Sequence, residues 1–133
     1  MREIIDKIAW IHTKDGKLLS TLSKGKSVYY IPGGKREKGE TDHETLVREV
    51  KEELDVDILL DTVDYLGVYM AQSDGAAEGV KVKMTCYSSD YTGELKASSE
   101  IERFEWHRMS DLKKVSAVDK IIYLDLFSRG LIK

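Results

Sequence analysis

The sequence predicts an α/β fold, an α/β/α sandwich with a mixed β-sheet between helices, in a single domain covering residues 1–133. Short alternating or β-branched segments separated by turn residues predict strands, and apolar residues recur at helical spacing before residue 55 and again near the C-terminus. Strands, a helix, further strands and a second helix are typical of a sheet covered by helices. A chain of 133 residues is also the length of one ordinary domain.

The first third of the chain predicts strands separated by turns. Ile4 to Ile11 carries apolar residues among polar ones and predicts a strand, which Lys14-Asp15-Gly16 ends in a hairpin turn. Lys17 to Leu22 begins the second strand, and Lys24-Gly25-Lys26 breaks it. Val28 to Ile31 predicts another short strand, because β-branched and aromatic residues favour extended backbone.

A loop and then a helix are expected next. Pro32-Gly33-Gly34 ends the third strand, since proline removes a ladder donor and glycine permits unusual backbone angles. Thr41 and Glu44 form a T-x-x-E capping box, which predicts a helix from about 42 to 54. The apolar residues at helical spacing are Leu46, Val47, Val50 and Leu54. We expect this stripe to face the core and the acids of the helix to face outward.

The second half of the chain predicts three more strands and a helix. Val63 to Met70 is strand-like, and the small polar stretch 72–79 is expected to form a lid over the site. Apolar and polar residues alternate from Val80 to Tyr87, as in a half-buried strand, and Ile101 to His107 predicts the last strand. Ser110-Asp111 suggests a turn. A C-terminal amphipathic helix is predicted by Val118, Ile121, Ile122 and Leu126.

Composition and charge exclude several classes of protein. Hydrophobic residues make up 41% and charged residues 34%, which excludes a disordered or fibrous chain. The chain has no apolar run of the ~20 residues that cross a bilayer, and its N-terminus, MREIIDKIAWIH, lacks the apolar core of a signal peptide. We therefore expect a cytoplasmic protein with no membrane partner. The single cysteine, Cys86, is consistent with a reducing compartment and is expected to be buried. A net charge of −3 argues against broad nucleic-acid binding but leaves a small anionic substrate open.

Three acids of the predicted helix indicate a metal site. Glu49, Glu52 and Glu53 are three and four positions apart, so they are neighbours on one helical face. Like charges at these spacings destabilise a helix by roughly 0.2–0.5 kcal/mol per pair. A hard cation such as Mg²⁺, which takes oxygen ligands, would offset that repulsion.

The residues around this face match the Nudix box, G-x5-E-x7-R-E-U-x-E-E-x-G-U, where U is a bulky aliphatic residue. The residues in register are Gly34, Glu40, Arg48, Glu49, Val50, Glu52, Glu53 and Val56. Only the late glycine differs, being Asp55, and we expect Asp55 to adopt the left-handed conformation that ends a helix. The chain therefore resembles the MutT-like Nudix hydrolases, which implies their fold.

That resemblance implies hydrolysis of a nucleoside diphosphate linked to another group, with Mg²⁺ or Mn²⁺ as cofactor. It implies Glu52 and Glu53 as metal ligands, with Glu49 as a ligand or as the group that orients the attacking water. The Gly34 carbonyl would be a further ligand. Arg48 would orient a glutamate, since Glu52 lies four residues on and Glu44 four residues back.

Other residues are weaker candidates for the site. Glu40 lies outside the helix and would support the loop or a second metal. Family members often bring one more acid from a late loop, for which Glu100 is the candidate and Glu102 the reserve. Lys81 and Lys83 could meet substrate phosphates, although solvated lysines are the more common case. The aromatic residues that could stack a base or fill the core are Tyr29, Tyr69, Phe104 and Trp106, with core as the default. His43 and His107 lack partners at ligand spacing and are taken as surface or structural residues.

The substrate expected from the resemblance is a nucleoside triphosphate or a related small nucleotide. ADP-ribose and dinucleoside polyphosphates are disfavoured, because the only proline, Pro32, precedes the box, and Ala71 and Gln72 occupy the region of the tyrosine associated with dinucleoside polyphosphate enzymes. The alternative from another class is a non-catalytic Nudix-like module that senses a nucleotide or metabolite. A homodimer is also left open.

Overall fold

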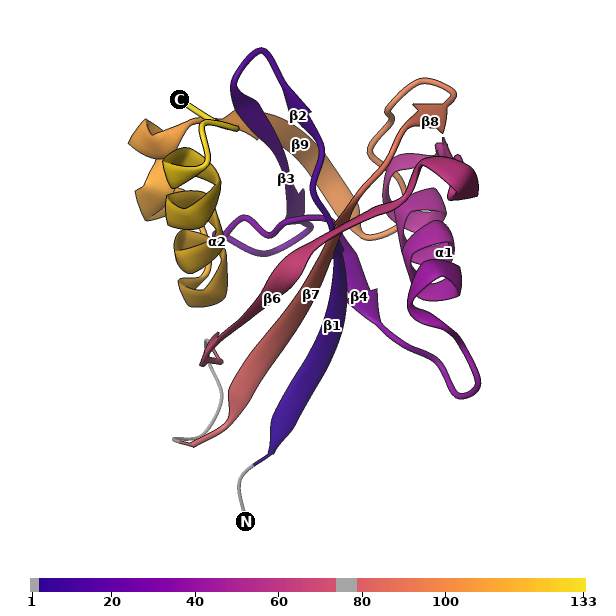
Figure 1. Ribbon diagram of the computed structural model, residues 1–133, viewed down its shortest axis with the longest axis horizontal. Helices are drawn as coiled ribbons and strands as arrows, with labels where there is room; N and C mark the ends of the chain where they lie inside the picture. The colour runs from indigo at the N-terminus through magenta and orange to yellow at the C-terminus, as the bar shows by residue number, and fades with distance from the viewer. Residues whose placement is uncertain (1–2, 74–78) are drawn as a thin grey trace.

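The computed structural model describes residues 3–73 and 79–133 and is an α/β/α sandwich (Figure 1). In chain order its elements are β1 Ile4–Trp10, β2 Thr13–Lys14, β3 Lys17–Ser23, β4 Gly33–Lys35, α1 Asp42–Leu54, β5 Asp57–Ile58, the 3-10 helix η1 Leu60–Thr62, β6 Asp64–Gln72, β7 Lys81–Ser88, β8 Tyr91–Thr92, β9 Ile101–His107, the 3-10 helix η2 Met109–Lys114 and α2 Ala117–Ser128.

The expected mixed sheet is confirmed. Its strand order is β4-β1-β7-β6, in which β1 and β7 are parallel and the other neighbours are antiparallel. A second, antiparallel sheet has the order β2-β3-β9, and β5 pairs with β8 in a short ribbon. The hairpin turn between β2 and β3 also forms as expected, since Asp15 and Gly16 both have positive φ, 54° and 74°.

The two helices lie on opposite sides of the mixed sheet (Figure 1). Strand β1 contributes side chains to the hydrophobic core beneath each helix. Ile8 and Trp10 pack with the apolar residues of α1, whereas Ala9 and Ile11 pack with those of α2. Successive side chains of a strand point to opposite faces, so one strand can contribute to both cores. Cys86 is fully buried in the core beneath α2, as predicted, and burial raises the pKa of its thiol to about 12.

Several local predictions were wrong. The segment from Val28 to Ile31 is not a strand, because it makes only isolated bridges, from Tyr29 to Val115 and from Tyr30 to Thr21. Gly33 and Gly34 were expected to open a loop. They instead form strand β4 with Lys35, pair with the backbone of β1, and the loop follows this strand. The turn expected at Ser110-Asp111 is part of η2.

Two further predictions concern the C-terminal helix and the stretch 72–79. The buried stripe of α2 is displaced from the predicted one, since Ile121 is 42% exposed while Tyr123 is buried. The proposed lid falls mostly on residues 74–78, which lie outside the described residues.

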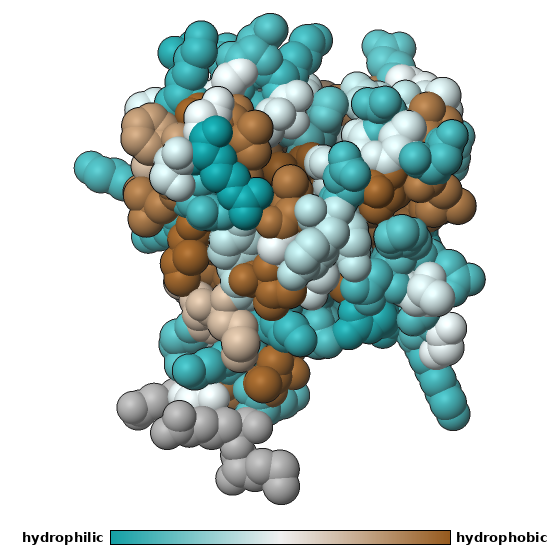
Figure 2. All heavy atoms as spheres, in the orientation of Figure 1, coloured by the Kyte–Doolittle hydropathy of each residue, from teal (hydrophilic) through white to brown (hydrophobic). Residues whose placement is uncertain are grey.

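Some large apolar side chains remain on the surface. Figure 2 shows apolar residues interspersed with polar ones on the face viewed. On β6 and α2 the exposed large apolar residues are Tyr65, Val68, Met70, Ile121, Leu124 and Phe127. None of the described helices is both long enough and apolar enough to cross a membrane.

Helix α1 has the boundaries that its capping signals predict. The Thr41 side chain accepts a hydrogen bond from the backbone N–H of Glu44, and the Glu44 carboxylate accepts one from the N–H of Thr41. At the other end Asp55 has φ 58° and ψ 34°, the expected left-handed conformation, and its N–H donates to the Lys51 carbonyl. Lys51 Nζ lies 3.6 Å from an Asp55 carboxylate oxygen.

We expect Asp55→Gly to be neutral or to stabilise the protein by up to about 1 kcal/mol, with turnover nearly unchanged. Glycine relieves left-handed strain of roughly 1–2 kcal/mol and removes a negative charge at the helix C-terminus. It also loses the exposed ion pair with Lys51, about 0.3–0.5 kcal/mol, and has greater entropy in the unfolded chain. Thermal melting and steady-state rates measure both effects. A variant that melts several degrees lower would show that the Asp55 side chain stabilises this turn.

Candidate active site

Two glycines of β4 allow helix α1 to bring two carboxylates against the backbone. A Cβ on Gly34 would lie 2.4 Å from the carboxyl carbon of Glu49, so only glycine leaves room for that side chain. The backbone N–H of Gly33 donates a hydrogen bond to Glu53 Oε1 at 3.1 Å. Gly33 itself has φ 144°, and a Cβ there would lie 2.0 Å from the Ile8 carbonyl oxygen. The close approach of β4 to both β1 and α1 therefore requires glycine at both positions.

Glu53 was predicted to face outward, but it is buried. Its exposed fraction is 7%, because its helical position places it beside the apolar stripe and beneath β4. Burial raises the pKa of Glu53 to about 8, the hydrogen bond from Gly33 opposes that shift, and the nearby charges of Glu49 and Glu100 add to it. A buried carboxylate with other acids beside it is suited to binding a cation.

The other two glutamates of this face lie in different environments. The Glu49 side chain is 15% exposed, and burial raises its pKa although the Arg48 guanidinium opposes the shift. Arg48 Nη1 donates to Glu49 Oε1 at 3.0 Å. The Glu52 side chain is 51% exposed and 3.5 Å from the same Arg48 nitrogen. The acids are therefore increasingly buried from Glu52 through Glu49 to Glu53.

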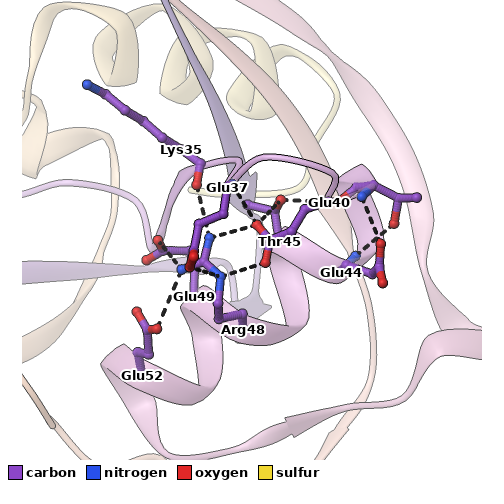
Figure 3. Close-up of polar contacts among 9 residues, drawn as sticks. Lys35, Glu37, Glu40, Glu44, Thr45, Arg48, Glu49 and Glu52 are labelled. Carbon is purple, nitrogen blue, oxygen red and sulfur yellow. Dashed lines mark hydrogen bonds and ion pairs between the residues drawn. The ribbon is translucent and has the colours of Figure 1, made fainter.

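Arg48 joins the loop before α1 to the face of the helix (Figure 3). Its Nε and Nη2 donate to the two carboxylate oxygens of Glu40 at 2.7 and 2.8 Å, and Nη2 also donates to the Lys35 carbonyl at 3.0 Å. Of the two helical glutamates expected near Arg48, Glu52 lies 3.5 Å from its Nη1, whereas Glu44 caps the helix instead. Glu40, the weakest acid of the box by sequence, is thus the main partner of Arg48.

Glu40 also accepts two hydrogen bonds from residues other than Arg48. The Glu37 N–H and the Thr45 hydroxyl both donate to its Oε1, at 2.8 and 2.9 Å. These donors, Arg48 foremost, lower the pKa of Glu40 to about 2. Glu40 therefore supports the loop, and it does not line the cleft described below.

We expect Glu40→Gln to lower the melting temperature by several degrees at pH 7 and by much less at about pH 3. A carboxylate whose pKa is depressed on folding stabilises the protein above its unfolded pKa, and that contribution is lost as pH falls toward its folded value. Thermal melting of both proteins at the two pH values measures the difference. Glu37→Gln is the matched control, because Glu37 also contacts Arg48, at 3.0 Å, but its side chain is 64% exposed. A difference that is the same at both pH values would contradict the ionic role of Glu40.

A cleft of about 430 Å³ opens beside β4 and α1. Carboxylates and ammonium groups share its wall, namely Glu49, Glu53, Glu100, Asp119, Lys7, Lys26 and Lys35. Among the described residues, Arg48 and Glu52 do not line it. The structure therefore brings Glu49, Glu53 and the Gly34 backbone together with the late-loop acid Glu100.

The remaining sequence candidates lie elsewhere. Glu102 pairs with Arg103 at the surface, and the cleft lining that the structure describes includes neither Lys81 nor Lys83. Tyr29 is buried in the core beneath α2, and Tyr69 packs against that core. Phe104 and Trp106 pack against the core beneath α1, where Trp106 also contacts the His12 ring. His43 is exposed and touches Tyr87, while the buried His107 contacts Tyr123 and Glu105, so both are surface or structural residues as expected.

Sequence reasoning missed several residues of the cleft, among them Asp119, Lys7 and Tyr30. Asp119 is fully buried at the start of α2, and its Oδ2 accepts a hydrogen bond from the Ile31 N–H at 2.8 Å. A signal for it existed in the Ser116-x-x-Asp119 pattern, since Ser116 caps this helix and fixes where its first turn lies. Lys7 and Tyr30 carried no such signal, because their place depends on how distant strands pair.

The donor set of the cleft suits a hard divalent cation, since it consists of carboxylate and carbonyl oxygens. Within residues 3–73 and 79–133, however, no group of three or more His, Cys, Asp or Glu side chains converges closely enough to hold a metal ion. Glu53 is turned to Gly33 and Glu49 to Arg48. Each carboxylate is thus held by a different partner through its Oε1 atom.

Fold and family are shown by comparison with known proteins. The structure matches the crystal structure of a MutT NUDIX hydrolase from Burkholderia pseudomallei with a TM-score of 0.74 at 22% identity, covering 92% of this chain and 97% of that one, so the two share a MutT-like fold. A family model of the NUDIX domain matches residues 7–126. The chain therefore belongs to the Nudix family.

Two curated relatives support this assignment. The chain is 32% identical over 106 residues to the ADP-ribose pyrophosphatase of Methanocaldococcus jannaschii, covering 77% of this chain and 61% of that protein. It is 24% identical over 101 residues to a Bacillus subtilis protein named Uncharacterized Nudix hydrolase YvcI, covering 76% and 64%. The chain thus spans less than two thirds of the length of both relatives.

Proposed function

We propose that this protein is a divalent-metal-dependent pyrophosphohydrolase that cleaves a nucleoside diphosphate linked to another group, with a nucleoside triphosphate or a related small nucleotide as substrate. One observation carries the proposal. Within a Nudix fold, the buried Glu53, the partly buried Glu49 and the late-loop acid Glu100 share one cleft with three lysines. Such a cleft offers oxygen ligands for a cation and positive charge for phosphates.

The residues that would hold the metal are Glu49, Glu52, Glu53 and Glu100, with the Gly34 carbonyl. When bound, Mg²⁺ or Mn²⁺ would neutralise phosphate charge, polarise a phosphoryl oxygen and lower the pKa of a bound water. Glu53 would bind as a carboxylate, because a nearby cation favours the charged form and opposes the effect of burial on its pKa.

The other residues of the site act by positioning. Hydrolysis adds the oxygen of water to phosphorus and breaks the anhydride P–O bond, and such displacement depends mainly on alignment and charge stabilisation. Arg48 holds Glu49 at 3.0 Å and fixes the loop through Glu40 and the Lys35 carbonyl. If Glu49 orients the attacking water, Arg48 sets the position of its carboxylate.

A second substrate class has one observation in its favour. One relative of this chain is named an ADP-ribose pyrophosphatase. Against it stands the absence of a proline after the box, since Pro32 is the only proline of the chain. The non-catalytic sensor is less well supported, because Glu49, Glu52 and Glu53 are all present. The homodimer stays a prediction that the molar mass in solution would test.

The deciding experiment is a hydrolysis screen with Mg²⁺ and with Mn²⁺. Nucleoside triphosphates, ADP-ribose, nucleotide sugars and dinucleoside polyphosphates would each be incubated with the protein, and the products separated by anion-exchange chromatography. We expect a nucleoside monophosphate and a second phosphorylated product from at least one compound. Saturable nucleotide binding without turnover of any compound would favour the sensor and contradict the proposed enzyme.

A further inference from the structure

Two lysines on adjacent strands line the cleft. Lys7 of β1 and Lys35 of β4 are directly opposite each other in the antiparallel register, and both line the cleft. Directly opposed residues of an antiparallel pair project from the same face, and like charges in that arrangement destabilise the sheet. An anionic ligand between the two ammonium groups would remove that repulsion.

Neither lysine is neutralised by a carboxylate. Across residues 3–73 and 79–133, no carboxylate oxygen lies within the 4.0 Å of an ion pair from either ammonium group. Lys7 Nζ lies 5.6 Å from the centroid of the Tyr30 ring, which attracts the cation but leaves its charge intact. In Figure 3 the Lys35 side chain extends away from the Arg48 cluster. Lys26, from the loop after β3, adds a third ammonium group to the same cleft.

We propose that Lys7 is a specificity-determining residue that binds a substrate phosphate and makes the cleft prefer nucleotides ending in a phosphoryl group over those ending in a neutral sugar. The inference rests on the proposed function, because it places the scissile anhydride beside Glu49 and Glu53. Lys7 is half-buried beside the Tyr30 ring, and partial burial strengthens its attraction to an anion. A terminal phosphoryl group carries charge that an ammonium can bind, whereas a terminal ribosyl group carries none.

ATP and ADP-ribose form a matched pair of probes, because they share adenosine 5′-diphosphate and differ in the terminal group. We expect wild type to prefer ATP. In Lys7→Met, kcat/KM for ATP should fall about 10- to 100-fold, mainly through KM, which is the range for a lost hydrogen bond to a charged group. For ADP-ribose we expect a fall of less than about threefold. Lys81→Met is the control, since Lys81 is exposed on β7 of the same sheet and outside the cleft lining.

Two further measurements separate phosphate binding from a structural role. Lys7→Arg keeps the charge and should restore most of the preference for ATP. The fall of kcat/KM for ATP with ionic strength should be weaker in Lys7→Met than in wild type, because one screened attraction is missing. Equal losses for ATP and ADP-ribose, or a preference of wild type for ADP-ribose, would overturn the inference.

Binding of α,β-methylene-ATP in Mg²⁺ distinguishes failure of this inference from failure of the proposed function. Turnover that is unaffected by Lys7→Met would overturn the role of Lys7 and leave the enzyme standing. Binding that weakens at least about tenfold in Lys7→Met, without turnover of any nucleotide by wild type, would support the role of Lys7 and overturn the enzyme. Absence of both binding and turnover would overturn both.

Discussion

Glu53→Gln is expected to lower turnover of the best substrate at least about a hundredfold while the fold survives, which is the scale of losing a group that acts through a bound metal. The side chain keeps its shape, and its amide oxygen can still accept the hydrogen bond from Gly33. It loses the negative charge that a cation would bind. Steady-state rates measure the loss, and Glu94→Gln is the control, since Glu94 is exposed and lies outside the cleft lining. Activity within a few-fold of wild type would mean that Glu53 is not a metal ligand.

The same variant tests the burial of Glu53. In the absence of metal, wild-type stability should fall as pH rises from the ordinary glutamate pKa toward about 8, because the folded state holds its proton more tightly than the unfolded chain. Glu53→Gln cannot titrate and should lose that slope. Parallel pH profiles of melting temperature for the two proteins would show that Glu53 is ionised in the folded, metal-free state.

Mg²⁺ or Mn²⁺ is expected to raise the melting temperature of wild type by several degrees. A ligand that binds only the folded state stabilises it by RT ln(1 + [L]/Kd), about 2.7 kcal/mol at a hundredfold excess over Kd. A variant with Gln at Glu49, Glu52 and Glu53 should gain much less, although its metal-free form should be at least as stable, because the repulsion among the three acids is gone. Monovalent salt at matched ionic strength controls for screening. Equal shifts for the two proteins would place the cation elsewhere.

The sequence by itself determined the local features of this protein. Helix α1 begins after Thr41 and ends at Leu54 as predicted, and Asp55 takes the left-handed turn. The hairpin at Asp15 and Gly16 forms, and β9 has the predicted bounds. These features depend on hydrogen bonds and steric limits within a few residues, so a short stretch of sequence is enough to specify them.

The sequence also indicated family membership, because the box residues follow one another at fixed spacing. The family comparison confirms that membership. The functional roles of Glu49, Glu52 and Glu53 stay predictions. What the sequence could not supply was the environment of each acid. Glu53 is buried and Glu52 exposed although they are adjacent in the chain.

Only the tertiary structure decided which distant residues meet. The pairing of Lys7 with Lys35 follows from the register of β1 and β4, and a shift of one residue would have turned Lys7 to the other face of the sheet. Glu40 meets Arg48 because the loop folds back onto α1, and Tyr30 lines the cleft while it bridges to Thr21 of β3. Such contacts depend on how separate elements pack, and no spacing along the chain encodes that packing.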